Sequence, residues 1–182
     1  MRTPLALLFA ALLAFPAHAD QNDPRLERLF NQLAVIRTAP EANDIEVQIT
    51  KIWLESGSDT VDVLMSRAQT AFDAQDFAAA KKLLDAVTEM RPDFAEVWYR
   101  RAELLLAMDS QQEAAADLAK TIELEPRHFK AYAIAGRIAD VAGDKSAALD
   151  AYRRAVKLNP MLEAIARRAG QLTSETISRP PT

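Results

Sequence analysis

A repeat of 34 residues is the feature that most constrains what this chain can fold into. Three prolines recur at this interval, at Pro92, Pro126 and Pro160. Small and large apolar positions keep the same register, in the columns Ala68, Ala102 and Gly136; Ala80, Ala114 and Ala148; and Leu64, Trp98 and Tyr132. A fixed period of this length predicts a stack of short units in which each unit covers an apolar face of the next.

Each repeat has the pattern of two amphipathic helices. In the second repeat Trp98 and Ala102 lie one turn apart on one helical face. A second helix is expected to begin after Ser110, whose side chain could form a capping box with Glu113, and to end before Pro126. The small columns are expected where two helix backbones approach closely, because a larger side chain would push them apart.

These columns resemble the tetratricopeptide repeat family. The family pattern is a large apolar residue, a small one, an alanine and a proline, and it is found as Trp98, Ala102, Ala114, Pro126; as Tyr132, Gly136, Ala148, Pro160; and more weakly as Leu64, Ala68, Ala80, Pro92. The resemblance covers residues 61 to about 162 and implies an all-α solenoid of helical hairpins. Its three repeats would lie at about 61–94, 95–128 and 129–162, within a repeat region at 58–160.

Two arginines stand where the family usually has leucine. Arg67 and Arg101 are predicted either to pair with carboxylates of the preceding helix, for example Arg101 with Asp85 or Glu89, or to extend along the apolar surface with their charge in water.

The ends of the chain depart from the repeat. Residues 20–57 read as a degenerate helical hairpin that acts as a cap and covers the exposed face of the first repeat, since terminal units of a solenoid are atypical. Residues 161–172 read as a C-terminal capping helix. Residues 173–182 are polar, include Pro180 and Pro181, and are predicted to be disordered.

The first 19 residues have the features of a cleavable signal peptide. Arg2 precedes an apolar run from Leu5 to Phe15, and Ala17 and Ala19 supply the small residues that precede a cleavage site. The run is too short to span a bilayer, which takes about 20 residues in a helix. We therefore expect cleavage after Ala19, a bacterial periplasmic or secreted location, and no membrane span in the mature chain.

Composition argues against several functions. With 22 Lys and Arg against 26 Asp and Glu, the net charge of −4 disfavours nucleic acid as the ligand. The absence of cysteine removes thiolate nucleophiles and thiolate metal sites, and four glycines leave no phosphate-binding loop. His128 has no catalytic partner in the sequence. We expect no enzyme activity, no cofactor and no metal site.

The resemblance implies that the first helix of each repeat lines a concave groove. The helix positions outside the core columns are then the candidates for partner contact: Met65, Gln69, Phe72, Glu96, Tyr99, Arg100, Glu103, Lys130, Ile134 and Arg137. Arg and Tyr among apolar residues are typical of protein interfaces. The basic clamp with which some family members bind acidic chaperone tails is absent, because Met65 and Gln69 replace its first lysine and asparagine.

These observations predict an exported interaction module, or scaffold, that binds a protein or peptide segment in its groove. The alternative is a structural protein that self-associates through exposed helix faces, as a homo-oligomer with no separate ligand.

Overall fold

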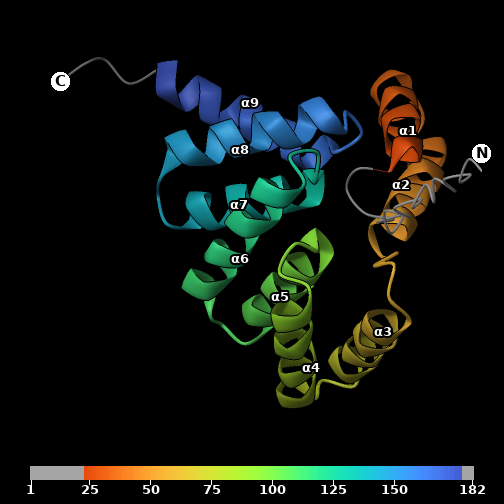
Figure 1. Cartoon of the computed structure of the whole chain (residues 1–182). Helices are drawn as coiled ribbons and strands as arrows, with labels where there is room; N and C mark the ends of the chain where they lie inside the picture. Colours follow the sequence, from red (N-terminus) through yellow and green to blue (C-terminus); the bar gives the residue numbers. More distant parts are fainter. Residues whose placement is uncertain (1–22, 178–182) are drawn as a thin grey trace, which may run out of the picture.

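The computed structural model describes residues 23–177, and this part of the chain contains helices and no strands. Its helices are α1 (Pro24–Val35), α2 (Ala39–Trp53), α3 (Asp59–Asp73), α4 (Phe77–Met90), α5 (Ala95–Ala107), α6 (Gln111–Leu124), α7 (Phe129–Val141), α8 (Lys145–Leu158) and α9 (Glu163–Ile177). Figure 1 shows α3 to α9 stacked along an arc. The all-α solenoid of helical hairpins is confirmed. The predicted signal peptide at residues 1–19 lies outside the described residues.

The turn inside each hairpin is the same in the three repeats. The backbone enters the left-handed region at Gln75, Asp109 and Gly143, with φ angles of 60°, 61° and 82°. These positions share the 34-residue register, although only the third is a glycine, the residue that adopts this conformation most easily. The repeat therefore extends to the backbone conformation of the loops.

Aspartate caps start the second helix in two of the repeats. The Asp76 carboxylate accepts a hydrogen bond from the Ala79 backbone N–H at 3.0 Å, and Asp144 accepts one from Ala147 at 2.9 Å. The capping box predicted for the middle repeat is wrong, because the Ser110 side chain makes no hydrogen bond to the start of α6.

The small-residue columns lie at close helix contacts, as predicted. The alanines at 80, 114 and 148 are fully buried. Gly136 on α7 faces the ring of Tyr152 on α8, and a Cβ atom added there would lie 2.5 Å from Cδ1 of that ring. Only a residue without a side chain allows α7 and α8 to approach this closely.

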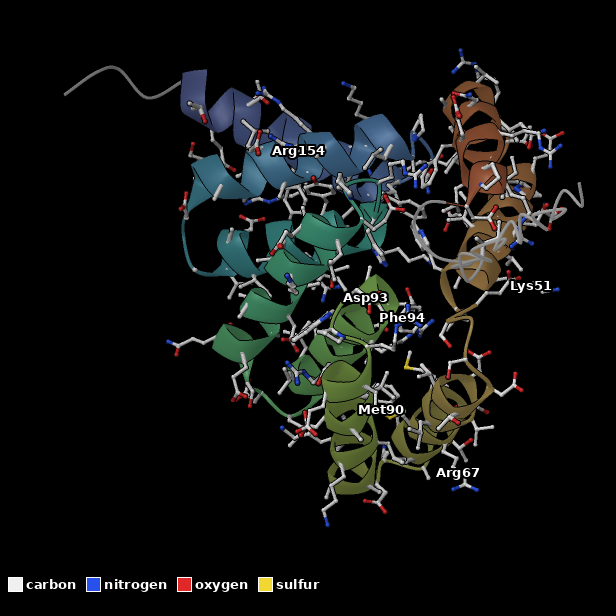
Figure 2. The ribbon with its side chains drawn as sticks, in the orientation of Figure 1. Lys51, Arg67, Met90, Asp93, Phe94 and Arg154 are labelled. Atoms are coloured by element: carbon white, nitrogen blue, oxygen red, sulfur yellow. The ribbon has the colours of Figure 1, made fainter. Side chains whose placement is uncertain are left out.

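Arg101 joins three helices through its guanidinium group. Its Nε and Nη2 atoms donate to the two carboxylate oxygens of Asp117 on α6 at 2.7 and 2.8 Å, and Nη1 donates to Asp85 on α4 at 3.1 Å. The predicted pair with Asp85 is confirmed, and the pair with Asp117 adds the following helix. Arg67 is exposed on α3, so its charge lies in water, as the second alternative expects (Figure 2).

The N-terminal hairpin, α1 and α2, packs elsewhere than predicted. It does not cover the first repeat, because its apolar side chains share a core cluster with Phe129 of α7, Leu158 of α8 and the turn that follows α8. At the edge of this contact the Asn159 amide donates to Glu46 of α2 at 2.6 Å. Figure 1 shows the hairpin at the open side of the arc, beside the ends of α7 and α8. The expected position was wrong because the hairpin's large apolar side chains find their partners on the third repeat.

The C-terminal helix is longer than predicted. α9 runs to Ile177, so residues 173–177 are helical rather than disordered. Leu172 is fully buried against α8, and Glu175 pairs with Lys145 of that helix, which holds the last turn in place. Arg168 of α9 donates to both oxygens of Asp140 on α7 at 2.6 and 2.7 Å. The rest of the predicted disordered tail, residues 178–182, lies outside the described residues.

Candidate functional site

The inner face of the arc, formed by α3, α5 and α7, is divided by the N-terminal hairpin. Over the second and third repeats the hairpin is docked by Trp53, whose ring stacks on that of His128 with 4.2 Å between centroids and 8° between planes. The Trp53 indole N–H also donates to Glu125 at 3.3 Å. Lys130 donates to Thr50 of α2 at 3.0 Å. The hairpin therefore occupies the inner face at the start of α7 and at the turn that precedes it.

A row of buried, hydrogen-bonded side chains connects the hairpin to α5. His128 is 1% exposed and its Nδ1 accepts the Ala131 backbone N–H at 3.1 Å, which leaves Nε2 to donate to Glu96 at 3.3 Å. Glu96 is 2% exposed, and its other oxygen accepts from Arg100 Nε at 2.8 Å. Burial raises the pKa of Glu96, but the hydrogen bond from His128 and the charge of Arg100 outweigh it, so the pKa is lowered. Glu96 is thus a buried carboxylate that fixes Arg100.

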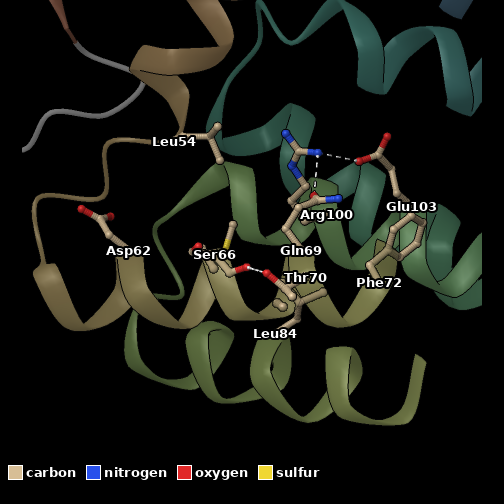
Figure 3. Close-up of a pocket in the computed structure, with 11 residues that line it drawn as sticks. Leu54, Asp62, Ser66, Gln69, Thr70, Phe72, Leu84, Arg100 and Glu103 are labelled. Atoms are coloured by element: carbon tan, nitrogen blue, oxygen red, sulfur yellow. Dashed lines mark hydrogen bonds and ion pairs between the residues drawn. The ribbon is translucent and has the colours of Figure 1, made fainter. Parts of the chain in front are cut away.

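A cavity of about 700 Å³ lies open on the inner face between α3 and α5. Figure 3 shows α3 along one side, Arg100 and Glu103 of α5 on the other, and Leu54 at the rim. Leu54 directly follows the docked Trp53, so the hairpin places one wall of the cavity. The lining residues are Leu54, Asp62, Met65, Ser66, Ala68, Gln69, Thr70, Phe72, Leu84, Arg100 and Glu103.

Arg100 lies at the centre of the cavity's polar contacts. Its Nη1 atom lies 3.4 Å from the Gln69 side-chain oxygen and 3.4 Å from a Glu103 carboxylate oxygen. The other Glu103 oxygen accepts the Tyr99 hydroxyl at 2.9 Å. Burial, followed by the negative charge of Glu103, raises the pKa of Tyr99, so this hydroxyl stays a hydrogen-bond donor. The arrangement is a fixed surface of mixed polarity that can hold a ligand by contact and charge.

The structure divides the ten predicted groove residues into three sets. Those that line the cavity together are Met65, Gln69, Phe72, Arg100 and Glu103. Those buried beneath or behind it are Glu96, Tyr99 and the half-buried Ile134, which packs beside Tyr99 in a core cluster. Lys130 is engaged by the hairpin, and Arg137 is exposed on α7 away from the cavity.

Sequence reasoning missed several lining residues. Asp62, Ser66 and Thr70 share one face of α3 at a spacing of four residues, which an inspection of polar positions on that helix could have found. Leu54 had no such signal, because its place depends on how the hairpin docks.

Across residues 23–177, no group of three or more histidine and carboxylate side chains is arranged to hold a metal ion. No helix there is both long and apolar enough to cross a membrane.

The sequence is similar to known repeat proteins. A family model described as tetratricopeptide repeat matches residues 65–120 and 112–161. A TPR repeat-containing protein of Rhizobium etli is 34% identical over 136 residues, which make up 75% of this chain and 67% of that protein.

Two solved structures show the same fold in complex with peptides or partners. The first TPR of Spaghetti (RPAP3), bound to the HSP90 peptide SRMEEVD, has a TM-score of 0.59 and 17% identity and covers 65% of this chain and 94% of its own. The TPR2B domain of yeast Sti1, in a pHsp70 complex, has a TM-score of 0.56 and 23% identity and covers 67% of this chain and all of its own (100%). At these identities the likeness concerns the fold.

Proposed function

The chain belongs to the tetratricopeptide repeat family, and from this premise we propose that it is a protein-interaction module that holds a peptide segment of a partner in the cavity between α3 and α5. The single observation that carries the proposal is that the hairpin leaves a cavity of about 700 Å³ open on the inner face. The HSP90 peptide bound to the Spaghetti domain supports a segment, rather than a small molecule, as the ligand.

A short segment fits the cavity better than a long one. Trp53 and its neighbours lie on the inner face at the junction of the second and third repeats, so a partner cannot run along the whole arc without displacing the hairpin. The fixed contacts of Arg100 also limit the ordering that binding requires of the receptor. The proposal assigns no catalytic step to the chain.

The test is a substitution that fills the cavity. Ser66→Trp places an indole on the exposed α3 face that lines it, and Ser146→Trp makes the same change on an exposed position of α8 as the matched control. Each protein, residues 20–182, is incubated with envelope extract of the source bacterium and the captured proteins are identified by mass spectrometry. We expect one or more proteins retained by the unchanged chain and by Ser146→Trp and lost with Ser66→Trp. Equal retention by both variants would place the binding surface elsewhere.

We also propose that the chain works outside the cytoplasm, in the periplasm or beyond it. The support is the positive start, the apolar run from Leu5 to Phe15 and the small residues before Asp20. The intact mass and N-terminus of the protein from a periplasmic fraction test this. A chain that begins at Asp20 is expected, and a cytoplasmic chain that begins at Met1 would contradict export.

The competing proposal is self-association without a separate ligand. It predicts a molar mass that rises with protein concentration in light scattering and no retained partner. The exposed apolar side chains of the described residues include Val35, Val47 and Val141, which lie on different helices. This scatter gives self-association less support than the cavity gives to peptide binding.

A further inference from the structure

The two ends of the cavity carry carboxylates. Asp62 lies near the start of α3 and Glu103 near the end of α5, and Figure 3 shows them at opposite ends of the row of lining side chains. Asp62 accepts hydrogen bonds from the Ser56 N–H at 3.2 Å and hydroxyl at 2.5 Å, which hold its carboxylate in place. Both groups are fixed acceptors at the cavity surface.

The one cation among the lining residues is already matched. Arg100 is paired with Glu96 beneath the cavity at 2.8 Å and approaches Glu103 at 3.4 Å. Burial lowers the pKa of Arg100, but the charges of Glu96 and Glu103 outweigh it, so the pKa is raised. Counting Asp62 with these three groups leaves an excess of negative charge around the cavity.

The buried floor of the cavity is apolar. Met65 and Leu84 form the buried floor, and Phe72 and Leu54 contribute further apolar surface. A ligand that fills this space with a large apolar side chain removes apolar surface from water, at about 25 cal/mol for each Å².

From this arrangement we propose that the cavity selects a segment in which a large apolar side chain is flanked by lysine or arginine. This inference rests on the function proposed above and adds the chemical class of the partner. An acidic segment would place its carboxylates beside Asp62 and Glu103, and these like charges would repel one another. The cavity thus discriminates by charge at its ends and by apolar contact with its floor.

The probe for the test is a display library of short random peptides, which assumes nothing about the natural partner. The library is selected in parallel on the unchanged chain, on Glu103→Gln with Asp62→Asn, and on the matched control Glu113→Gln. Both amide substitutions keep the shape and one acceptor oxygen, remove the charge and turn the other oxygen into an NH2 donor, while Glu113 lies exposed on α6 outside the cavity.

We expect peptides enriched on the unchanged chain to combine aromatic or large aliphatic residues with an excess of lysine and arginine. Their affinity should fall about two- to thirtyfold in the double variant, the range for the loss of two partly exposed ion pairs, and should stay unchanged in Glu113→Gln. Raising the salt concentration from about 0.1 to 1 M should weaken binding to the unchanged chain more than binding to the double variant.

The outcomes separate the two proposals. If the enriched peptides are acidic or neutral, compete with one another and no longer bind Ser66→Trp, the charge selectivity is overturned and the peptide-binding function is retained. If the enriched peptides are cationic but bind Ser66→Trp and the double variant as tightly as the unchanged chain, they are attracted to another surface. This result would also overturn the selectivity. Failure to enrich any peptide would overturn the function and the inference with it.

Discussion

Replacement of Trp53 by alanine should release the N-terminal hairpin and leave the repeats folded. Trp53 is 3% exposed and stacks on His128, so its removal leaves a cavity in the contact between the hairpin and the third repeat. Truncation of a buried tryptophan costs about 3–5 kcal/mol. Each 1.4 kcal/mol is a factor of ten, so the population with the hairpin undocked should rise about a hundred- to several-thousandfold.

The loss should be confined to the hairpin because of how it is attached. Its core cluster includes residues of α7 and α8, whereas α3 to α6 are held by two other clusters that contain no residue of α1 or α2. Residues 54–58 link it to α3 without helical structure beyond a turn. Opening of the hairpin therefore exposes one interface and leaves the contacts between repeats in place.

Hydrogen exchange followed by mass spectrometry measures this opening directly. In Trp53→Ala the amides of α1 and α2 should exchange faster by the factor given above, while those of α5 and α6 keep their protection. Val35→Ala, at a position on α1 that is 69% exposed, serves as the control and should change neither. Equal loss of protection in the hairpin and in α5 and α6, or no change in the hairpin, would refute the role given to Trp53.

Three further changes test other contacts. Gly136→Ala should lower the free energy of unfolding by about 1–3 kcal/mol in urea denaturation, because its Cβ would meet the Tyr152 ring at 2.5 Å. Gly170→Ala, which has open space around it, is the control and should raise the free energy of unfolding by about 0.5–1 kcal/mol. A similar effect of both substitutions would contradict the close contact between α7 and α8. Arg101→Met should cost about 3–5 kcal/mol in the same assay because it leaves the buried Asp117 carboxylate on α6 without its partner, whereas Asp85 on α4 keeps Lys81. A loss below about 1 kcal/mol would show that water replaces the guanidinium group. The hydrogen bonds from Arg168 of α9 hold the pKa of Asp140 below its usual 3.8. The stability they provide is therefore present above pH 3.8 and is lost as the pH falls through the lower pKa of the folded state. Asp140→Asn should flatten this decline of stability at low pH, and an unchanged pH profile would contradict the role of the pair.

The repeat region could be predicted because its determinants are local and periodic. The spacing of Trp98, Ala102 and Ala114 defines two helices and the contact between them without any knowledge of distant residues. Arg101 could be paired with Asp85 for the same reason, since adjacent helices of one solenoid lie side by side. The left-handed turns follow the same period, although Gln75 gives no residue-type signal for one.

The position of the hairpin could not be predicted because it depends on contacts between residues far apart in the sequence. Trp53 and His128 are separated by 75 positions and show no common pattern, yet their stack determines where α1 and α2 lie. The candidate site changed with it. Glu96 is buried, where it accepts hydrogen bonds from His128 and Arg100. Lys130 donates a hydrogen bond to α2, and Leu54 becomes part of the cavity wall.

The most direct test of the account is photo-crosslinking from inside the cavity. A photoreactive phenylalanine analogue is placed in living cells at Thr70, an exposed lining residue, and in a separate strain at Ser146 on α8 as the control. We predict that Thr70 forms a covalent adduct with a discrete partner protein through a cationic, apolar segment, and that Ser146 does not form this adduct. Absence of an adduct from Thr70, or the same adduct from both positions, would contradict the claim that the cavity between α3 and α5 is where this protein binds its partner.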